Sequence, residues 1–430
     1  MRTLFVLLTL IAFTLIPLSA AGAGEPEIKG QLRFRPEFHN NKFFQDGSNA
    51  GFIGQRIRFS IGGETDDSIK YFIQAQDARV WGETGNVSTA TEGADANALD
   101  LYQAYVQVND FFVEGLSLKM GRQTLVYGDQ RLLGHLGWQD RARTHDAFKV
   151  TYKIQDLGQI DLFSSKEAEL SANTASGKAA GTTETNLQGV YSMWKIAGNN
   201  LDVYYLAWTD NAGERNVTTT GARINGKFAP IDYTLEYASQ GGDWAKNVTQ
   251  SANALAAKVG YSLDQWSTRI GVEYDAGSGD DGSDATTHKD FVFPYHTNHA
   301  HYGFMDYFSW GNMSDIQLQL KTKPGDGKAV VKLTYHMLAL AESKGKWLNV
   351  VGTTNNGGPI GGGNAAYKET AAGSEIDLTV VYPYSDSMKI IGGYSMFQKG
   401  DAVKERFKAV NGTDNSKDPT WGYLMFVVNI

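Results

Sequence analysis

Arginines are concentrated in the first third of the chain. A guanidinium stays charged at any working pH and binds a carboxylate or phosphate through two parallel hydrogen bonds. Placed on one wall of a lumen, such residues would concentrate anions. Nine of the fourteen arginines lie between positions 33 and 143, and they are Arg33, Arg35, Arg56, Arg58, Arg79, Arg122, Arg131, Arg141 and Arg143.

Carboxylates lie among these arginines and offer a second interpretation. They could pair with the guanidinium groups in salt-bridge networks that only fill the interior of the protein. Both roles are compatible, because a region with more arginines than carboxylates keeps a net positive charge. The carboxylates concerned are Glu37, Asp77, Asp129, Asp140 and Asp146.

Three further motifs resemble ligand sites, but we interpret each of them as an ordinary loop. His296, His299 and His301 have a spacing that a metal could use, yet a folded loop in which the imidazoles bond to backbone is the better interpretation. Residues 275–284 are acidic and turn-rich, but they lack the spacing and the distal Glu of a calcium-binding EF-hand loop. Residues 357–363 are glycine-rich without the strand-to-helix transition of a phosphate-binding loop. We therefore predict no metal, no cofactor and no catalytic residue.

The two ends of the chain indicate export and a membrane barrel. Met1 and Arg2 precede an apolar run at residues 4–16 and then small residues, which is the layout of a secretory signal peptide. We predict a signal peptide at residues 1–23 and one domain at residues 24–430. No later stretch has the roughly 18 consecutive apolar residues of a membrane helix. The last twelve residues alternate as a closing, lipid-facing strand would.

Composition agrees with an all-β membrane protein. The chain has 48 glycines, 12% aromatic residues and only 9 prolines, which suits many short strands, tight turns and aromatic girdles. It has no cysteine, so either core packing or closure of a sheet must stabilise it, and a barrel supplies the second. The net charge of -8 argues against binding to nucleic acid.

Eighteen strands can be placed between residues 31 and 430, and their connections alternate in length. Short connections fall at residues 62–68, 109–115, 153–158, 196–199, 262–264, 323–328 and 383–387. Long polar ones fall at residues 82–98, 166–185, 275–313, 342–374 and 399–419. An even strand number with alternating connections predicts a transmembrane antiparallel β-barrel with short periplasmic turns, long extracellular loops and both termini in the periplasm.

The pattern within single strands supports this prediction. In residues 31–38 and 54–61, apolar residues alternate with arginines and other polar residues. An arginine facing lipid at the bilayer midplane costs on the order of 2–4 kcal/mol, so these arginines are expected to face the lumen. The same rule places Tyr102, Leu118 and Met120 outside. The aromatic residues of 275–313 predict that this loop folds into the mouth as a constriction, whereas the Gly/Asn-rich loop 342–374 is expected to be mobile.

Three segments resemble the alginate export family of outer-membrane porins: residues 76–82 (QDARVWG), 121–134 and 291–312. The resemblance spans residues 30–430. It implies a monomeric eighteen-stranded barrel in the outer membrane of a Gram-negative bacterium, with a basic lumen that passes an anionic substrate. By motif position, Arg79, Asp129 and Arg131 match the constriction residues of the family.

Three functions remain open at this stage. The first is a porin for anionic small molecules or an anionic polysaccharide, with the nine arginines and Asp129 along its path. The second is a barrel scaffold or conduit that sheathes a partner protein, which leaves room for a periplasmic partner. The third is a barrel enzyme with a Ser and a His on neighbouring strands, although no nucleophile motif supports it. We therefore predict that the protein is not an enzyme.

Overall fold

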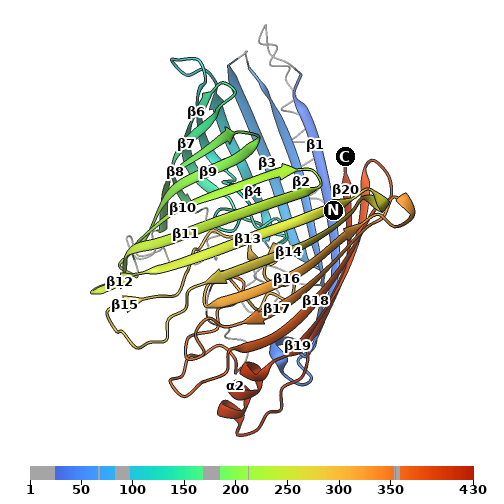
Figure 1. The fold of residues 1–430 in the computed structure, drawn as a ribbon. Coiled ribbons are helices and arrows are strands. Elements are labelled where there is room, and N and C mark those ends of the chain that lie inside the picture. The colour runs from blue at the N-terminus through green and yellow to red at the C-terminus, as the bar shows by residue number, and fades with distance from the viewer. Residues whose placement is uncertain are drawn as a thin grey trace.

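The wall of the protein is a closed antiparallel β-barrel of eighteen strands, which confirms the predicted fold class (Figure 1). The computed structural model describes residues 25–65, 68–82, 97–167, 185–211, 213–352, 354 and 359–430. The predicted signal peptide lies outside the described residues, as do most of the long connections at 82–98 and 166–185. Among the described residues, no helix is long and apolar enough to cross a bilayer.

Each strand of the wall pairs with its neighbours in sequence. The wall strands are β1 (Glu27–Asn40), β2 (Ala50–Glu64), β3 (Ile69–Val80), β4 (Asn97–Val108), β5 (Leu116–Gln123), β6 (His145–Ile154), β7 (Gly158–Glu167), β8 (Thr185–Ile196), β9 (Asn199–Asp210), β10 (Arg215–Phe228), β11 (Ile231–Ala245), β13 (Ala252–Leu263), β14 (Thr268–Gly277), β16 (Met313–Thr322), β17 (Val330–Ala339), β18 (Ala371–Pro383), β19 (Met388–Lys399) and β20 (Thr420–Asn429). Two short strands, β12 (Val248–Gln250) and β15 (Thr287–His288), pair with each other in parallel between the long connections.

The last strand closes the barrel against the first. β20 pairs antiparallel with β1, and Gly30 and Ile430 exchange two backbone hydrogen bonds of 2.8 Å. Because β1 begins and β20 ends at the rim that carries the short turns, this rim is the periplasmic one. The opposite rim carries the long connections and helix α2 (Asp401–Asn411) (Figure 1).

Alternation along the strands separates a lipid face from a lumen face. In β2, Ile57 and Phe59 are exposed on the outside, whereas Arg56 and Ser60 are buried inside. In β20, Leu424 is exposed on the outside, between the buried Tyr423 and Met425. The outward apolar residues form the belt that a bilayer requires.

Tyr102 departs from the predicted alternation. It was expected on the lipid face, but its side chain is buried and Arg58 lies over its ring at 3.9 Å. The register between β3 and β4 shifts after Gln74, and such a bulge turns a side chain to the other face.

The outer loops also contain order that the sequence analysis did not predict. The 400–419 connection includes α2, and Arg406 of this helix is fully buried. Arg406 donates four hydrogen bonds to carbonyl oxygens of the 340–370 connection. Trp347 of that connection is 0% exposed. The described part of this connection is therefore packed, contrary to the expectation of a mobile loop.

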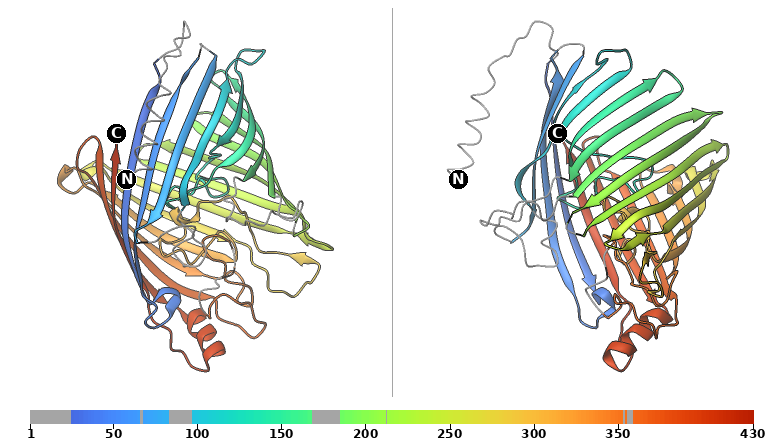
Figure 2. Two further views of the ribbon diagram at one scale, coloured as in Figure 1. Left: turned by 180° about the vertical axis from the view of Figure 1, so that it is seen from behind. Right: turned by 90° about the vertical axis from the view of Figure 1, so that its left-hand side faces the viewer.

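Two long connections fold into the barrel and pack together in its interior, as two further views show (Figure 2). One is the 124–144 loop between β5 and β6, and the other is the 278–312 loop between β14 and β16. Their apolar side chains form one buried cluster, which includes Leu133 and Tyr295. Burial of this apolar surface drives the loops inward. The predicted in-folding of the second loop is confirmed.

Candidate functional site

Arginines of β1 and β2 face inward and hold the 124–144 loop. Arg33 forms an ion pair with Asp140 and donates to the carbonyl oxygen of Gly137 at 2.8 Å. Arg56 donates to the carbonyl oxygens of Gly137 and Gln139 at 3.3 and 3.4 Å. These two guanidinium groups are buried, in residues that are only 4% and 6% exposed. They have the lumen orientation predicted for them, but their donors are largely occupied by the loop.

Arg35 and Arg58 continue the same wall. Arg35 is 1% exposed, forms an ion pair with Glu37 and lies over the ring of Trp138 at 4.2 Å. Arg58 donates to the side-chain oxygen of Gln76 at 2.7 Å. Much of this wall therefore agrees with the second interpretation, in which the arginines form networks that fill the lumen.

The other predicted residues of the 124–144 loop connect it to the rest of the lumen. Arg143 donates to the carbonyl oxygen of His296 at 3.0 Å, and the carbonyl oxygen of Arg141 accepts from Gln76 at 2.7 Å. Asp129 forms an ion pair with Arg223 of β10. The loop is thus attached to the wall on several sides.

Arg131 crosses the lumen to β14. Its guanidinium forms ion pairs with Glu273 and, at 3.1 Å, with Asp275, and it donates to the hydroxyl of Tyr302 at 2.9 Å. The side chains of Arg131 and its two carboxylate partners are at most 3% exposed. Arg131 therefore joins both in-folded loops to the wall.

Arg79 and Arg122 lie on the outer face, which corrects the prediction that they line the lumen. Arg79 pairs with Asp77 at 2.6 Å and its side chain is 61% exposed. Arg122 pairs with Asp146 at 2.9 Å. In both strands the alternation that directs neighbouring apolar residues outward also directs these arginines outward. They lie near the extracellular ends of their strands, where charge facing the lipid is inexpensive.

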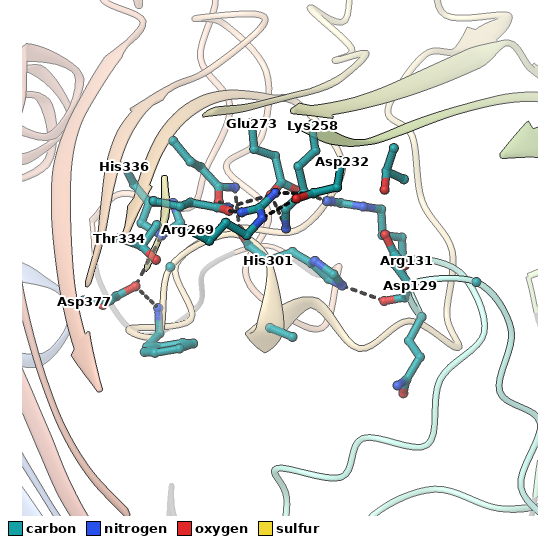
Figure 3. A pocket seen from close by; sticks show the side chains of 18 residues that line it. Asp129, Arg131, Asp232, Lys258, Arg269, Glu273, His301, Thr334, His336 and Asp377 are labelled. Carbon is teal, nitrogen blue, oxygen red and sulfur yellow. Dashed lines mark hydrogen bonds and ion pairs between the residues drawn. The ribbon is translucent and has the colours of Figure 1, made fainter. Parts of the chain in front are cut away.

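An inner cavity of about 630 Å³ lies beside the 124–144 loop (Figure 3). Its lining is polar and combines Asp129 and Arg131 with wall residues of β11, β13, β14, β16, β17 and β18. Lys258 pairs with Glu273 at 3.0 Å, and Arg269 pairs with Asp232 at 2.6 Å. The cavity thus presents fixed charges of both signs.

A second cavity, of about 280 Å³, lies toward the extracellular loops. We call it the outer cavity. Its lining includes Arg35 and Glu37 of β1 and the aromatic residues Phe43, Phe52 and Trp138. The two cavities differ in character, since the inner one is lined by charges, amides and hydroxyls and the outer one largely by rings.

A row of cations that was not predicted from the sequence lies on the lumen face near the periplasmic rim. Arg269, Lys321 and Lys332 stand directly opposite one another on β14, β16 and β17. Arg269 pairs with Asp232, whereas neither lysine has an ion-pair partner within the described part of the chain. On the other side, Lys119 faces Lys149 across β5 and β6. The alternation of the predicted strands could have located these lysines, but only arginines were considered.

The histidines of the 278–312 loop bind different partners. His296 contacts the carbonyl oxygen of Val350 at 2.6 Å, His299 contacts Asp306 at 2.7 Å, and His301 contacts the carbonyl oxygen of Asp129 at 2.8 Å. Burial, together with Arg131, lowers the pKa of His301 to about 3. His301 is therefore neutral at physiological pH and donates a hydrogen bond that joins the two in-folded loops.

A serine and a histidine do meet on neighbouring strands. The hydroxyl of Ser165 lies 3.5 Å from Nδ1 of His145, and both residues are buried. The Nε2 atom of His145 has no hydrogen-bond partner among the described residues, so no carboxylate orients the ring there. A nucleophile–base pair needs such a third group, and this contact does not supply it.

Comparisons with known proteins agree with the barrel. The family model for alginate export matches residues 26–414. Among solved structures, OccAB1 of Acinetobacter baumannii is similar with a TM-score of 0.63 and 13% identity, covering 96% of this chain and 98% of that one. OccK9 (OpdG) of Pseudomonas aeruginosa has a TM-score of 0.63 and 10% identity, covering 94% and 98%. OpdK of Pseudomonas aeruginosa, solved with vanillate, has a TM-score of 0.59 and 10% identity, with the same coverage. No curated protein sequence matches significantly.

Proposed function

The chain belongs to the alginate export family and is a β-barrel of the Gram-negative outer membrane. We propose that it is a channel for anionic solutes or an anionic polysaccharide. The family indicates a porin-type transport channel. The sign of the preferred charge and the residues that set it belong to the proposal.

The cationic row at the periplasmic rim carries this proposal. Like charges directly opposite on neighbouring strands are destabilising, so Lys321 beside Lys332 is a costly arrangement for stability alone. Both lysines are exposed on the lumen face. Such unpaired cations at the mouth of a low-dielectric channel would raise the local concentration of anions. A substrate carboxylate could bind there without first breaking an ion pair.

The arginines of β1 and β2 have a supporting role in this proposal. Arg33, Arg35 and Arg56 are buried and bound to the 124–144 loop, so they act mainly by positioning that loop. Their charge still adds to the positive potential of the wall. The proposed contact residues for the anion are instead Lys321, Lys332 and Arg269.

The packed interior argues against a conduit for a folded partner. The in-folded loops fill the middle of the barrel with a buried apolar cluster. The two cavities described above, of about 630 and 280 Å³, suit a small solute or one chain of a linear polymer rather than a protein domain.

Planar bilayers with purified protein test the charge preference. Lys321→Glu combined with Lys332→Glu should invert or strongly reduce anion preference, read as the reversal potential in a salt gradient. A matched control is Lys323→Glu with Lys328→Glu, because these lysines lie in the short turn between the same two strands. An unchanged reversal potential in the first variant, or an equal shift in the control, would contradict the proposal.

A further inference from the structure

Among the residues that the structure describes, one lines both cavities of the lumen. This residue is Phe304. The inner cavity reaches toward the cationic row through Arg269 and Lys258. The outer cavity reaches the extracellular connections through Asn349 and Val351. Phe304 therefore lies between the inner and the outer cavity.

The ring of Phe304 belongs to an aromatic stack. It stacks on the imidazole of His299 with ring centres 5.1 Å apart, and His299 stacks on Trp138 at 4.3 Å. The guanidinium of Arg35 lies over the ring of Trp138 at 4.2 Å. Trp421 approaches the ring of Phe304 edge-on at 6.5 Å. The stack joins β1 to the 124–144 and 278–312 loops.

The backbone at Phe304 is held independently of its ring. The Phe304 N–H donates to Asp377 at 3.2 Å and the Met305 N–H donates to Glu375 at 2.9 Å. Gly303 has φ +86°, and a Cβ there would lie 2.4 Å from a carboxylate oxygen of Glu375. Only glycine allows this close approach of the loop to β18.

We propose that Phe304 is the specificity-determining constriction of the channel, an apolar gate between the outer and the inner cavity. The proposal rests on the function as a channel but not on its preference for anions. An apolar ring across a narrow passage excludes water, and hydrated ions then cross only when the ring moves aside. A solute that replaces the ring contacts would pass more readily than a small hydrated ion.

Single-channel conductance with Phe304→Ala tests the gate. Conductance should rise about two-fold or more, and larger neutral polyethylene glycols should enter the channel. Phe304→Leu keeps an apolar plug and should stay close to wild type. Phe52→Ala is the matched control, because Phe52 lines the outer cavity but not the inner one. Unchanged conductance and polymer cut-off in Phe304→Ala, or an equal rise in Phe52→Ala, would overturn the proposal.

A second variant moves the gate without removing its ring. Gly303→Ala should displace the backbone from Glu375 and raise conductance as Phe304→Ala does. Conductance that stays at the wild-type value in both variants would count against the gate. Heat-modifiable migration in gels verifies that each barrel is folded.

The reversal potential separates this proposal from the anion preference. If wild-type protein prefers anions and Phe304→Ala leaves conductance unchanged, only the gate is refuted. If wild-type protein shows no anion preference and Phe304→Ala raises conductance, the gate stands and the charge preference fails.

Discussion

Replacing Arg131 by methionine should release the 124–144 loop from the wall of the barrel. Arg131 is the point at which this loop meets Glu273 and Asp275 of β14 and Tyr302 of the 278–312 loop. All of these groups are buried. Methionine keeps much of the apolar stem but removes the charge, so the two carboxylates would face each other without their shared cation.

The free-energy cost of Arg131→Met depends on the partners that Glu273 and Asp275 keep. Removing one partner of a buried ion pair costs about 3–5 kcal/mol. Glu273 keeps Lys258 at 3.0 Å and Gln319 at 2.7 Å, and Asp275 keeps Gln317 at 2.9 Å. We therefore take the lower bound, about 3 kcal/mol, which corresponds to a change of roughly 150-fold in the docking equilibrium of the loop.

Labelling of a single introduced cysteine measures this equilibrium. The chain has no native cysteine, and Leu133 of the loop is 1% exposed, so Leu133→Cys reports each opening of the loop. Its reaction with an impermeant maleimide should be roughly 150-fold faster when Arg131 is methionine, if labelling follows the open population. Arg122→Met is the control, since Arg122 lies on the outer face.

A charge-free variant separates burial of charge from packing. Adding Glu273→Gln and Asp275→Asn to Arg131→Met removes the uncompensated buried charges, which cause most of the cost of the single variant. Slow labelling should then return. A labelling rate within a few-fold of wild type in the single variant would refute the role of Arg131 as the bridge between loop and wall.

Two more predictions concern the same loops. Burial and Arg131 lower the pKa of His301 to about 3. Neutral His301 therefore stabilises the docked loop fully above pH 6.5, and this stabilisation decreases as pH falls, because protonation favours the undocked loop. At pH 5 the docked loop has lost about 2 kcal/mol of stability. Single-channel conductance should therefore rise between pH 7.5 and pH 5, and His301→Gln, which keeps a donor for the carbonyl oxygen of Asp129, should flatten this dependence. Arg406→Met leaves four carbonyl oxygens of the 340–370 connection without their donor, so external trypsin should cleave at Lys344 or Lys346 faster than in wild type. The exposed Lys404→Met is the control, and equal cleavage in both variants would contradict this role.

The wall of the barrel could be predicted from the sequence because its information is local. Side chains alternate with a period of two along each strand, so the arginines of β1 and β2 were assigned to the lumen from neighbouring residues alone. The same rule was available for Arg122, since Leu118 and Met120 were placed outside and Arg122 shares their parity. Arg122 was assigned to the lumen because it is an arginine, although its position in the alternation places it on the outer face.

The contacts that build the site are not local. Arg131 and Glu273 are 142 positions apart, and nothing in either strand or loop indicates that they meet. Tyr102 was misplaced because a bulge in the pairing of β3 and β4 shifts the register, and a bulge has no reliable signal in a single sequence. The in-folding of 278–312 could be predicted because its aromatic residues would otherwise be exposed to water.

Arginine and lysine have different positions in the lumen, which would allow the proposed channel to be both packed and selective. A guanidinium offers several donors in a fixed plane, and in this barrel those donors hold carbonyl oxygens of the 124–144 loop, as Arg33 and Arg56 show. An ammonium group is a compact point charge on a flexible stem, and Lys321 and Lys332 keep theirs in the lumen near the periplasmic rim. In the proposed channel, the arginines therefore hold the in-folded loops and the lysines are free to meet the solute. Variants of the arginines alone would displace the in-folded loops, so a change in their ion selectivity would not report on the charge of the lumen by itself.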